Sequence, residues 1–199
     1  MLKQLANWWK RRGGSEKATA EDTPDAAQIA AIEQARAAMR DRPALDGTIR
    51  IVELDDPAVA AQLFRRKFGQ EIPQFPRHFV ALAGDVCAGY VHYTAWQGDY
   101  LCGGLCTDDR VYRALSPLQR AWVRERGGIA EIMMRHAHAA LSDGATIWGY
   151  IGDKQAEAVD RRVGFEKVAE PYLFAIWQKP ISAEGKQRRI AEAMKLGPF

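Results

Sequence analysis

Short apolar runs separated by turn-forming residues dominate the first half of the chain. Three such runs follow one another closely, and tight polar turns around Gly84 and Gly98 separate them. Runs of this length, rich in Val, Tyr and Phe, predict strands, and the tight turns predict antiparallel pairing. An earlier run places Ile49 and Ile51 on one face, which predicts another strand. The strands expected in this half are 48–54, 78–83, 86–96 and 100–106.

Apolar residues recur at helical spacing in the second half. They follow this spacing across 116–141, a stretch interrupted by Gly127-Gly128, so helices are expected on both sides of the glycines. A further helix is expected to open at Asp56-Pro57 and to close near Gly69. The remaining expected elements are a strand at 145–151, a helix at 153–162, a strand at 171–179 and a helix at 183–195. From residue 48 the order is β-α-β-β-β-α-β-α-β, which predicts an α+β (mixed α/β) class with helices flanking a mixed sheet.

Residues 1–47 are expected to form an extension. Thr23-Pro24 has the residue types of a helix start, and a helix is expected near 24–41. The small polar stretch 13–23 predicts a linker. Residues 1–12 mix Leu and Trp with cations, which is compatible with a weak membrane or protein contact; a short tail docked on its own domain is the favoured alternative. The expected division is therefore an extension at 1–47, one domain at 48–179 and a C-terminal helix at 180–199.

Positive charge is concentrated at the two ends of the chain. The 199 residues include 28 Lys+Arg and 25 Asp+Glu, a net charge of +3. Residues 1–17 hold five basic residues and one acid, and residues 179–199 hold five basic residues and two acids, so the body at 18–178 is acidic. This distribution argues against a nucleic-acid partner.

The cysteines and the N-terminus predict a cytoplasmic protein. Cys87, Cys102 and Cys106 are odd in number and lack the spacing of a disulfide framework, which favours reduced thiols. The N-terminus lacks the apolar core of a secretory signal, and no apolar run approaches the ~20 residues of a membrane span. His136 and His138 lie two apart on an expected helix and do not share a face, so no metal site is expected.

Two stretches are candidates for chemistry. In the first, Gly127-Gly128 falls where a helix begins, and the unpaired N–H groups of a helix start suit a phosphate or pyrophosphate. Its alternative is a glycine break between two packed helices, which this stretch alone favours. The second runs from Asp153 to Phe165, after one strand and before another. Its alternative is an ordinary helix with a glycine C-cap.

Taken together and in this order, the two stretches resemble the motifs of the GNAT family of acyl-CoA-dependent N-acyltransferases. Glu125-x-x-Gly128-x-Ala130 is similar to the family's acyl-CoA motif, with Glu at a position usually held by Gln or Arg. The second stretch is similar to the family's later motif, with Asp153 in place of Asn and Asp160 in place of Tyr. The residues that fit the later spacing are Asp153, Ala156, Gly164 and Phe165. The resemblance covers about 48–179, with an insertion between Thr107 and Gly128 in which Ser116-Pro117 predicts a separate helix.

The resemblance implies that acyl-CoA binds in a gap between two splayed strands, 100–107 and 145–151. Gly103-Gly104 could form a bulge there. The implied lining of the pantetheine arm is Leu105, Cys106 and Thr107, and the implied pyrophosphate ligands are the N–H groups of Arg126, Gly127, Gly128, Ile129 and Ala130, with Asp153 nearby. The oxyanion donor would be a backbone N–H of 105–107.

The resemblance also implies an acid and a base. The acid position holds Asp160, and Tyr150 on the adjacent strand is a substitute with a core-aromatic alternative. Asp108 is the first candidate for the base, because it ends the strand beside the expected thioester. The other base candidates are Asp109, Glu131 and His92, and each has the alternative of a solvated or structurally paired residue.

The sequence thus predicts an N-acetyltransferase that moves an acetyl group from acetyl-CoA to a small-molecule or peptide amine. The acidic body mildly favours a cationic amine. Two alternatives stay open. One is a catalytically degenerate GNAT-like module that binds a ligand or partner, which the changed Asn and Tyr positions support. The other is an adaptor role for the basic N-terminal segment. The sequence leaves the oligomeric state open.

Overall fold

The computed structural model describes residues 49–169 and 171–199. The helix expected near 24–41, the linker and the basic segment 1–12 lie outside the described residues.

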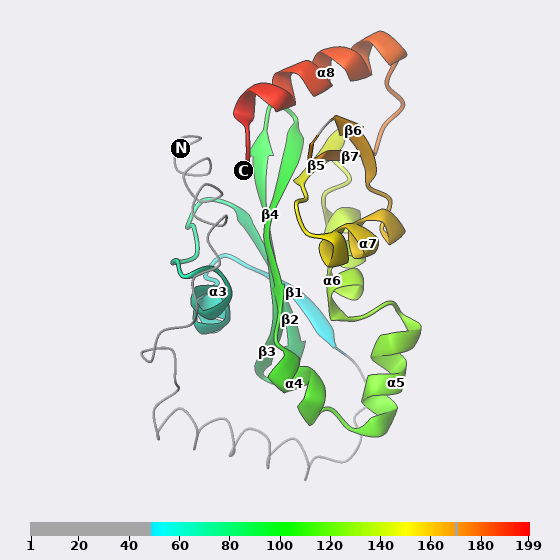
Figure 1. Cartoon of the computed structure of the whole chain (residues 1–199). Helices are drawn as coiled ribbons and strands as arrows, with labels where there is room; N and C mark the ends of the chain where they lie inside the picture. The colour runs from blue at the N-terminus through cyan, green and yellow to red at the C-terminus, as the bar shows by residue number, and fades with distance from the viewer. Residues whose placement is uncertain (1–48, 170) are drawn as a thin grey trace.

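Seven strands form one sheet in the order β1-β2-β3-β4-β5-β7-β6 (Figure 1). Every neighbouring pair is antiparallel except β4 and β5, which are parallel. The α+β class with a mostly antiparallel sheet is therefore confirmed. The strands are β1 Arg50–Leu54, β2 Arg77–Ala83, β3 Val86–Trp96, β4 Asp99–Thr107, β5 Thr146–Tyr150, β6 Glu166–Ala169 and β7 Leu173–Trp177.

The expected meander of 78–83, 86–96 and 100–106 is present as β2, β3 and β4. The last strand is shorter than the expected 171–179, and β6 was not predicted. β6 lies at the edge of the sheet, where Glu166 and Lys167 are exposed, so no apolar run marks it in the sequence.

Helices cover both faces of the sheet. The helix α3 packs on one face and α6 and α7 on the other (Figure 1). Residues of β3 alternate between the two faces, as a strand requires: Tyr90 packs in the cluster of Phe64 and Leu63, whereas Val91 and Tyr93 pack in the cluster of the α6 residues. The helices are η2 Ala58–Ala60, α3 Ala61–Phe68, α4 Asp109–Ala114, α5 Pro117–Glu125, α6 Ile129–Ala140, α7 Lys154–Arg162 and α8 Ala183–Leu196.

Side-chain caps mark the starts of several helices in the second half of the chain. Ser116 and Gln119 form a reciprocal capping box at α5, which confirms the separate helix expected from Ser116-Pro117. Asp153 caps α7 by accepting from the N–H of Gln155 at 2.8 Å. The short helix α4 was not predicted. Asp108 caps it by accepting from the N–H of Arg110 at 2.9 Å.

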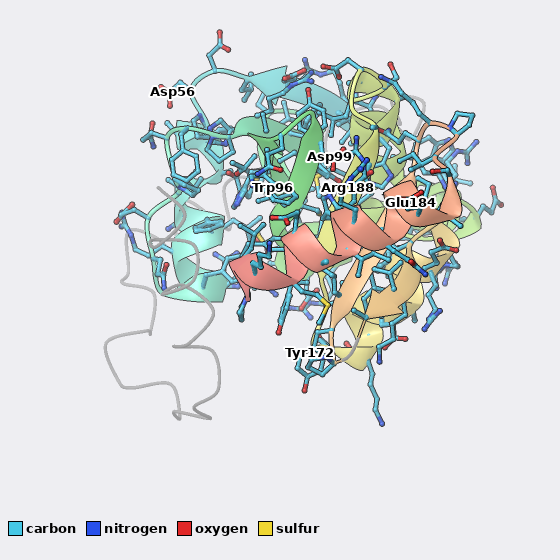
Figure 2. All side chains as sticks on the ribbon, turned by 90° about the horizontal axis from the view of Figure 1, so that it is seen from above. Asp56, Trp96, Asp99, Tyr172, Glu184 and Arg188 are labelled. Carbon is cyan, nitrogen blue, oxygen red and sulfur yellow. The ribbon has the colours of Figure 1, made fainter. Side chains whose placement is uncertain are left out.

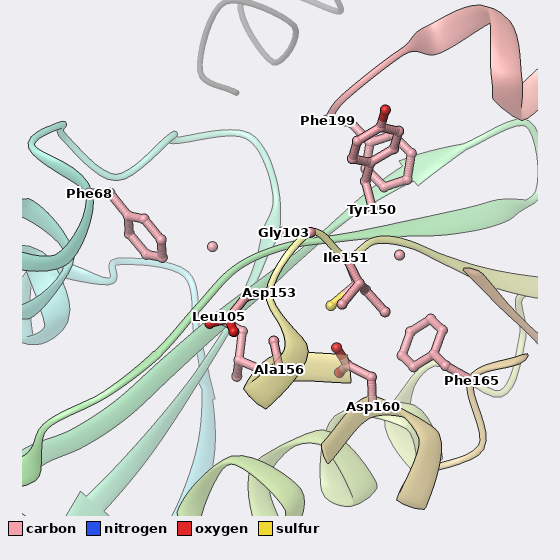
Figure 3. A pocket seen from close by; sticks show the side chains of 14 residues that line it. Phe68, Gly103, Leu105, Tyr150, Ile151, Asp153, Ala156, Asp160, Phe165 and Phe199 are labelled. Atoms are coloured by element: carbon pink, nitrogen blue, oxygen red, sulfur yellow. The ribbon is translucent and has the colours of Figure 1, made fainter. Parts of the chain in front are cut away.

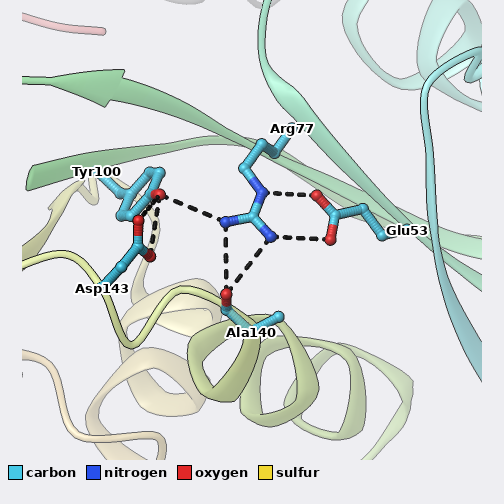
Figure 4. Close-up of polar contacts among 5 residues, drawn as sticks. All are labelled: Glu53, Arg77, Tyr100, Ala140 and Asp143. Atoms are coloured by element: carbon cyan, nitrogen blue, oxygen red, sulfur yellow. Dashed lines mark hydrogen bonds and ion pairs between the residues drawn. The ribbon is translucent and has the colours of Figure 1, made fainter.

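An arginine ties the first strands to the end of α6 (Figure 4). Arg77 donates to both carboxylate oxygens of Glu53, at 2.6 and 2.9 Å, and to the carbonyl of Ala140. It also donates to the hydroxyl of Tyr100, which in turn donates to Asp143. Because the last carbonyls of a helix lack intrahelical partners, this contact both caps α6 and fixes it against the sheet.

Helix α8 lies across the end of the β3–β4 hairpin, close to Asp99 (Figure 2), and a part-buried ion pair holds it there. Asp99 is 2% exposed and accepts from Arg189 of α8 at 2.6 and 2.7 Å. The indole N–H of Trp148 on β5 donates to the same carboxylate at 3.0 Å. Strand β4, strand β5 and helix α8 therefore meet at this one carboxylate.

Candidate functional site

The two central strands separate partway along their length. β4 and β5 pair only at Tyr100↔Ile147, Leu101↔Trp148 and Cys102↔Gly149, although β4 continues to Thr107. The gap expected between 100–107 and 145–151 therefore opens after Cys102, and backbone groups beyond it do not pair across to β5.

The strand β4 is bulged where the gap begins. Between two registered pairs, Tyr90↔Cys106 and His92↔Gly103, β3 advances two residues and β4 advances three. Gly104 has φ +61°, a left-handed conformation that glycine adopts without the usual steric cost. The bulge expected at Gly103-Gly104 is therefore confirmed.

A pocket fills the gap (Figure 3), and we call it the strand-gap pocket. Bulged residues of β4 form one side, the end of β5 and the loop after it form another, and α7 closes the base. Its lining comprises Phe68, Cys102, Gly103, Gly104, Leu105, Gly149, Tyr150, Ile151, Gly152, Asp153, Ala156, Asp160, Phe165 and Phe199. Of the residues expected at the site, this pocket brings together Leu105, Tyr150, Asp153 and Asp160.

Asp160 is a buried carboxyl group of the strand-gap pocket. Its residue is 5% exposed, and its side chain points from α7 into the pocket (Figure 3). Burial, with a smaller contribution from nearby Glu157, raises the pKa of Asp160 to about 7. Near neutral pH this group is therefore divided between the acid and the carboxylate, and can donate a proton.

Tyr150 also lines the strand-gap pocket, and its ring packs edge-on against Tyr172 and Phe199 with centroids 5.8 and 6.0 Å away. Burial, and then Tyr172, raise the pKa of the Tyr150 phenol. A raised pKa keeps the Tyr150 phenol a weaker acid than the Asp160 carboxyl. Asp160 is therefore the stronger proton donor of the two.

A second hollow lies at the glycine turn between α5 and α6, and we call it the glycine-turn hollow. Gly127 and Gly128 have φ of +81° and +102°. The chain turns there in a backbone conformation that is sterically unfavourable for residues with a Cβ. A Cβ at Gly128 would meet no atom within 4 Å. The lining comprises Thr107, Asp108, Asp109, Tyr112, Val123, Arg124, Gly127, Gly128, Ile129, Ala130 and Val159.

Only part of the expected anion ligand set is available at this turn. The N–H groups of Arg126, Gly127 and Gly128 already donate to carbonyls of α5, because the chain closes α5 before it opens α6. The first hydrogen bond of α6 runs from Ile132 to Gly128. Within the part of the chain that the structure describes, the N–H groups without a backbone acceptor are thus those of the first turn, Ile129 to Glu131, which shifts the expected anion site into α6.

Glu131 forms structural ion pairs with two arginines. Its carboxylate packs against Gly127 and accepts from Arg135 at 2.6 Å and from Arg162 at 2.8 Å. Burial alone would raise its pKa, but the hydrogen bonds from the two arginines hold the pKa of Glu131 below its usual value. The side chain therefore joins the glycine turn to the end of α7.

Asp108 and Cys106 lie outside the strand-gap pocket. Asp108 lines the glycine-turn hollow, caps α4 and pairs with Arg66 at 2.7 Å; Asp109 beside it is exposed. Cys106 packs in the α3-side cluster with Tyr90, and burial raises the pKa of its thiol to about 12. Leu105 and Thr107 point to the other side, because adjacent residues of a strand alternate.

A third pocket, which we call the aromatic pocket, lies on the α3 side of the bulge. Its lining comprises Phe64, Gln70, Glu71, Pro73, Gln74, Phe75, His92, Gly103, Gly104 and Phe199. Gly103, Gly104 and Phe199 also line the strand-gap pocket, so the two pockets meet at the bulge. No local sequence pattern predicts this pocket, because residues 70–77 indicate only a proline-containing loop.

Among the described residues, no group of three or more His, Cys, Asp and Glu side chains is arranged to hold a metal ion. Within 49–169 and 171–199, no helix combines the length and apolar character that a membrane span requires.

Solved structures resemble this arrangement of strands. The ribosomal-protein-S18-alanine N-acetyltransferase of Escherichia coli covers 68% of this chain and 97% of its own, with TM-score 0.49 and 12% identity. An IAA acetyltransferase from Bacillus cereus covers 65% and 99%, with TM-score 0.46 and 13% identity. The fold is similar to that of GNAT acetyltransferases. No family model and no curated protein matches the sequence.

Proposed function

We propose that the protein is an acyl-CoA-dependent N-acyltransferase that transfers an acetyl group from acetyl-CoA to an amine. The observation that carries the proposal is the separation of β4 and β5 after Cys102, with a bulge and a lined pocket at the opening. A parallel pair that stops bonding after three residues leaves backbone donors free beside a pocket, which suits an extended, amide-containing arm.

We assign the pyrophosphate, the pantetheine arm and the thioester of acetyl-CoA to successive positions along β4. Thr107 lines the glycine-turn hollow, Leu105 lines the strand-gap pocket, and Gly103 lies at the bulge. Four residues of strand span roughly 13 Å, which suits a pantetheine arm running from the hollow to the bulge. The thioester would then lie where the strand-gap and aromatic pockets meet.

The glycine-turn hollow fits a pyrophosphate. The first-turn N–H groups of Ile129, Ala130 and Glu131 are free, and the helix dipole favours an anion there. Arg124 also lines the hollow. The open space beside Gly128 admits a ligand that a side chain would exclude. Acetyl-CoA supplies an activated acyl group, and the residues of this chain orient it.

The reaction needs a proton donor for the leaving sulfur, and Asp160 fits this role. The amine nitrogen forms a bond to the carbonyl carbon, the C–S bond breaks, and the sulfur takes a proton from the Asp160 carboxyl, whose pKa of about 7 keeps it partly protonated. The attacking amine is in its neutral form, its nitrogen loses one proton to solvent after the attack, and solvent restores the proton of Asp160. We do not assign the base to Asp108, because it is engaged with Arg66 and the start of α4.

The acceptor would enter through the aromatic pocket. Phe64, Phe75 and Pro73 offer apolar surface, and the Glu71 carboxylate, which pairs with Arg65 at 2.6 Å, also lines the pocket. This combination suits a small-molecule or peptide amine with an apolar body. A cytoplasmic location is part of the same proposal, because that compartment supplies acetyl-CoA and keeps the thiols reduced.

Calorimetry with acetyl-CoA followed by thiol release with an amine panel tests the proposal. We expect saturable binding and amine-dependent release of CoA, and Asp160→Asn should reduce the turnover while binding persists. Asp55→Asn, an exposed aspartate outside the pocket lining, is the matched control. Absence of binding at millimolar acetyl-CoA would refute the proposal. Binding without thiol release would instead support the ligand-binding module, which the Asp at position 160 also favours.

A further inference from the structure

A histidine lies at the bulge with one ring nitrogen that bonds to none of the described residues. His92 on β3 is 4% exposed and lines the aromatic pocket. Its ring lies against the two glycines of the bulge: a Cβ at Gly103 would come within 2.7 Å of Nε2, and a Cβ at Gly104 within 2.6 Å of Cε1. The imidazole edge therefore reaches the junction of the two pockets only because both positions are glycine.

Three buried side chains form a hydrogen-bonded row that ends at this nitrogen. His78 Nδ1 lies 2.8 Å from the Tyr90 hydroxyl, and the same hydroxyl lies 3.3 Å from His92 Nδ1. His78 and His92 are cross-strand partners on β2 and β3, and Tyr90 shares their face because it lies two residues from His92. The Tyr90 hydroxyl has one proton, so it donates to one imidazole and accepts from the other.

The direction of hydrogen-bond donation along this row follows from His78, at the end away from the bulge. His78 Nε2 is buried and has no hydrogen-bond partner among the described residues. A buried N–H without an acceptor is rarer than a buried acceptor without a donor, which favours a bare Nε2 on His78 and a proton on its Nδ1. His78 then donates to Tyr90, Tyr90 donates to His92 Nδ1, and the proton of His92 is left on Nε2.

We propose that the Nε2–H of His92 donates a hydrogen bond to the carbonyl oxygen of the acyl thioester and to the oxyanion that forms when the amine attacks. This inference rests on the proposed function. As the nitrogen adds to the carbonyl carbon, the π electron pair moves to the oxygen, and the His92 proton stays on nitrogen throughout. The side chain thus adds to the backbone N–H expected from 105–107, from the opposite side of the bulge.

The surroundings of His92 suit a neutral donor. Burial, and then the neighbouring His78, lower the pKa of His92 to about 3, so the ring is uncharged at neutral pH. A neutral imidazole can polarise a carbonyl without a charge being buried. Phe64 packs beside the ring with centroids 6.1 Å apart, and the Tyr90 contact sets its tautomer, so the donor is held before the substrate arrives.

Nitrogen-15 NMR of the histidines in the full chain tests the tautomer without any ligand. We expect His92 to carry its proton on Nε2 and to have a bare Nδ1, with the signal identified by its loss in His92→Gln. Tyr90→Phe should move the population toward the other tautomer. A proton on Nδ1 of His92 in the unsubstituted protein would overturn the proposal.

Infrared difference spectra of bound acetyl-CoA labelled with carbon-13 at the carbonyl test the contact itself. We expect a lower carbonyl stretching frequency on the unsubstituted protein than on His92→Leu, and an intermediate value on His92→Gln, whose amide keeps an N–H donor. Turnover should fall roughly 10²-fold in His92→Leu, as for loss of one oxyanion donor. If His92→Leu fails to fold, His92→Gln and Tyr90→Phe provide the comparison.

The outcomes separate this inference from the proposed function. Bound acetyl-CoA with the same carbonyl frequency in the unsubstituted protein and the His92 variants would overturn the role of His92 and leave the proposed function intact. Failure of the unsubstituted protein to bind acetyl-CoA would remove the proposed function, and the role of His92 with it.

Discussion

Replacement of Asp160 by Asn should change how the stability of the protein depends on pH. Asp160 is 5% exposed, and its pKa is raised from 3.8 to about 7 in the folded protein. Below pH ~4 both the folded and the unfolded chain hold the proton. As the pH rises, the unfolded chain releases it first, so the folded state loses stability until its own carboxyl ionises. Asn does not ionise and lacks this loss.

The size of the effect follows from the shift. A difference of about three pKa units corresponds to about 4 kcal/mol, at about 1.4 kcal/mol per unit. Because the free energy of unfolding of a domain is typically only about 5–15 kcal/mol, a loss of this size is measurable. The free energy of unfolding of the unsubstituted protein should therefore fall relative to that of Asp160→Asn between pH ~4 and ~7.

Urea unfolding at pH 4.5, 6 and 7.5 measures this difference, with extrapolation to water at each pH. Asp55→Asn, a change at an exposed aspartate, controls for the change in net charge. Parallel profiles for Asp160→Asn and the unsubstituted protein across this range would show that the Asp160 carboxyl is not desolvated as described. The acid role proposed for it would then lose its physical basis.

Three further substitutions test the glycine turn, the bulge and the attachment of α8. Gly128→Ala should weaken acetyl-CoA binding by calorimetry. Gly69→Ala, at another positive φ in open space, should cost about 1–2 kcal/mol of stability and keep its affinity; equal affinities for the two variants would exclude the turn from the binding site. Gly104→Ala should lower the urea midpoint more than Gly69→Ala, because its Cβ also meets Phe64 and His92 within 2.7 Å. Arg189→Met should lower the free energy of unfolding in urea by about 3 kcal/mol, because buried Asp99 is left without its cation. A second change, Asp99→Asn, should recover part of this loss. If the double variant shows no recovery, the ion pair is not the cause of the loss.

The strands of the meander and the helix starts could be predicted because local signals specify them. Tight turns at Gly84 and Gly98 separate β2, β3 and β4, and Ser116 and Asp153 cap helices with their own side chains. The edge strand β6 has no such signal, since half of its four residues are exposed and charged. Alternation along β4 also indicates that Cys106 cannot face the same side as Leu105, an inference available from the sequence.

The rest of the site depends on contacts between distant segments. The aromatic pocket forms where the loop after α3 meets β3, β4 and the end of the chain, and no local pattern reports that encounter. The same holds for Asp160, whose raised pKa arises from burial, and for Glu131, which two arginines from different helices neutralise. The row of His78, Tyr90 and His92 could be noticed as alternate positions of two adjacent strands, but their contact needed the register.

The short parallel pairing of β4 and β5 also has a consequence for how the molecule assembles. Tight turns join β2, β3 and β4, and a segment with the short helices η2 and α3 joins β1 to β2. By contrast, residues 108–145 separate β4 from its partner β5 along the chain. Closing such a connection costs conformational entropy before any contact compensates for it. We therefore expect the meander to form before β5 pairs with Tyr100 to Cys102 of β4. Contacts of Arg77 with α6 and of Asp99 with α8 then hold helices against the sheet. The opening proposed as the site is then the part of the sheet where pairing between β4 and β5 stops.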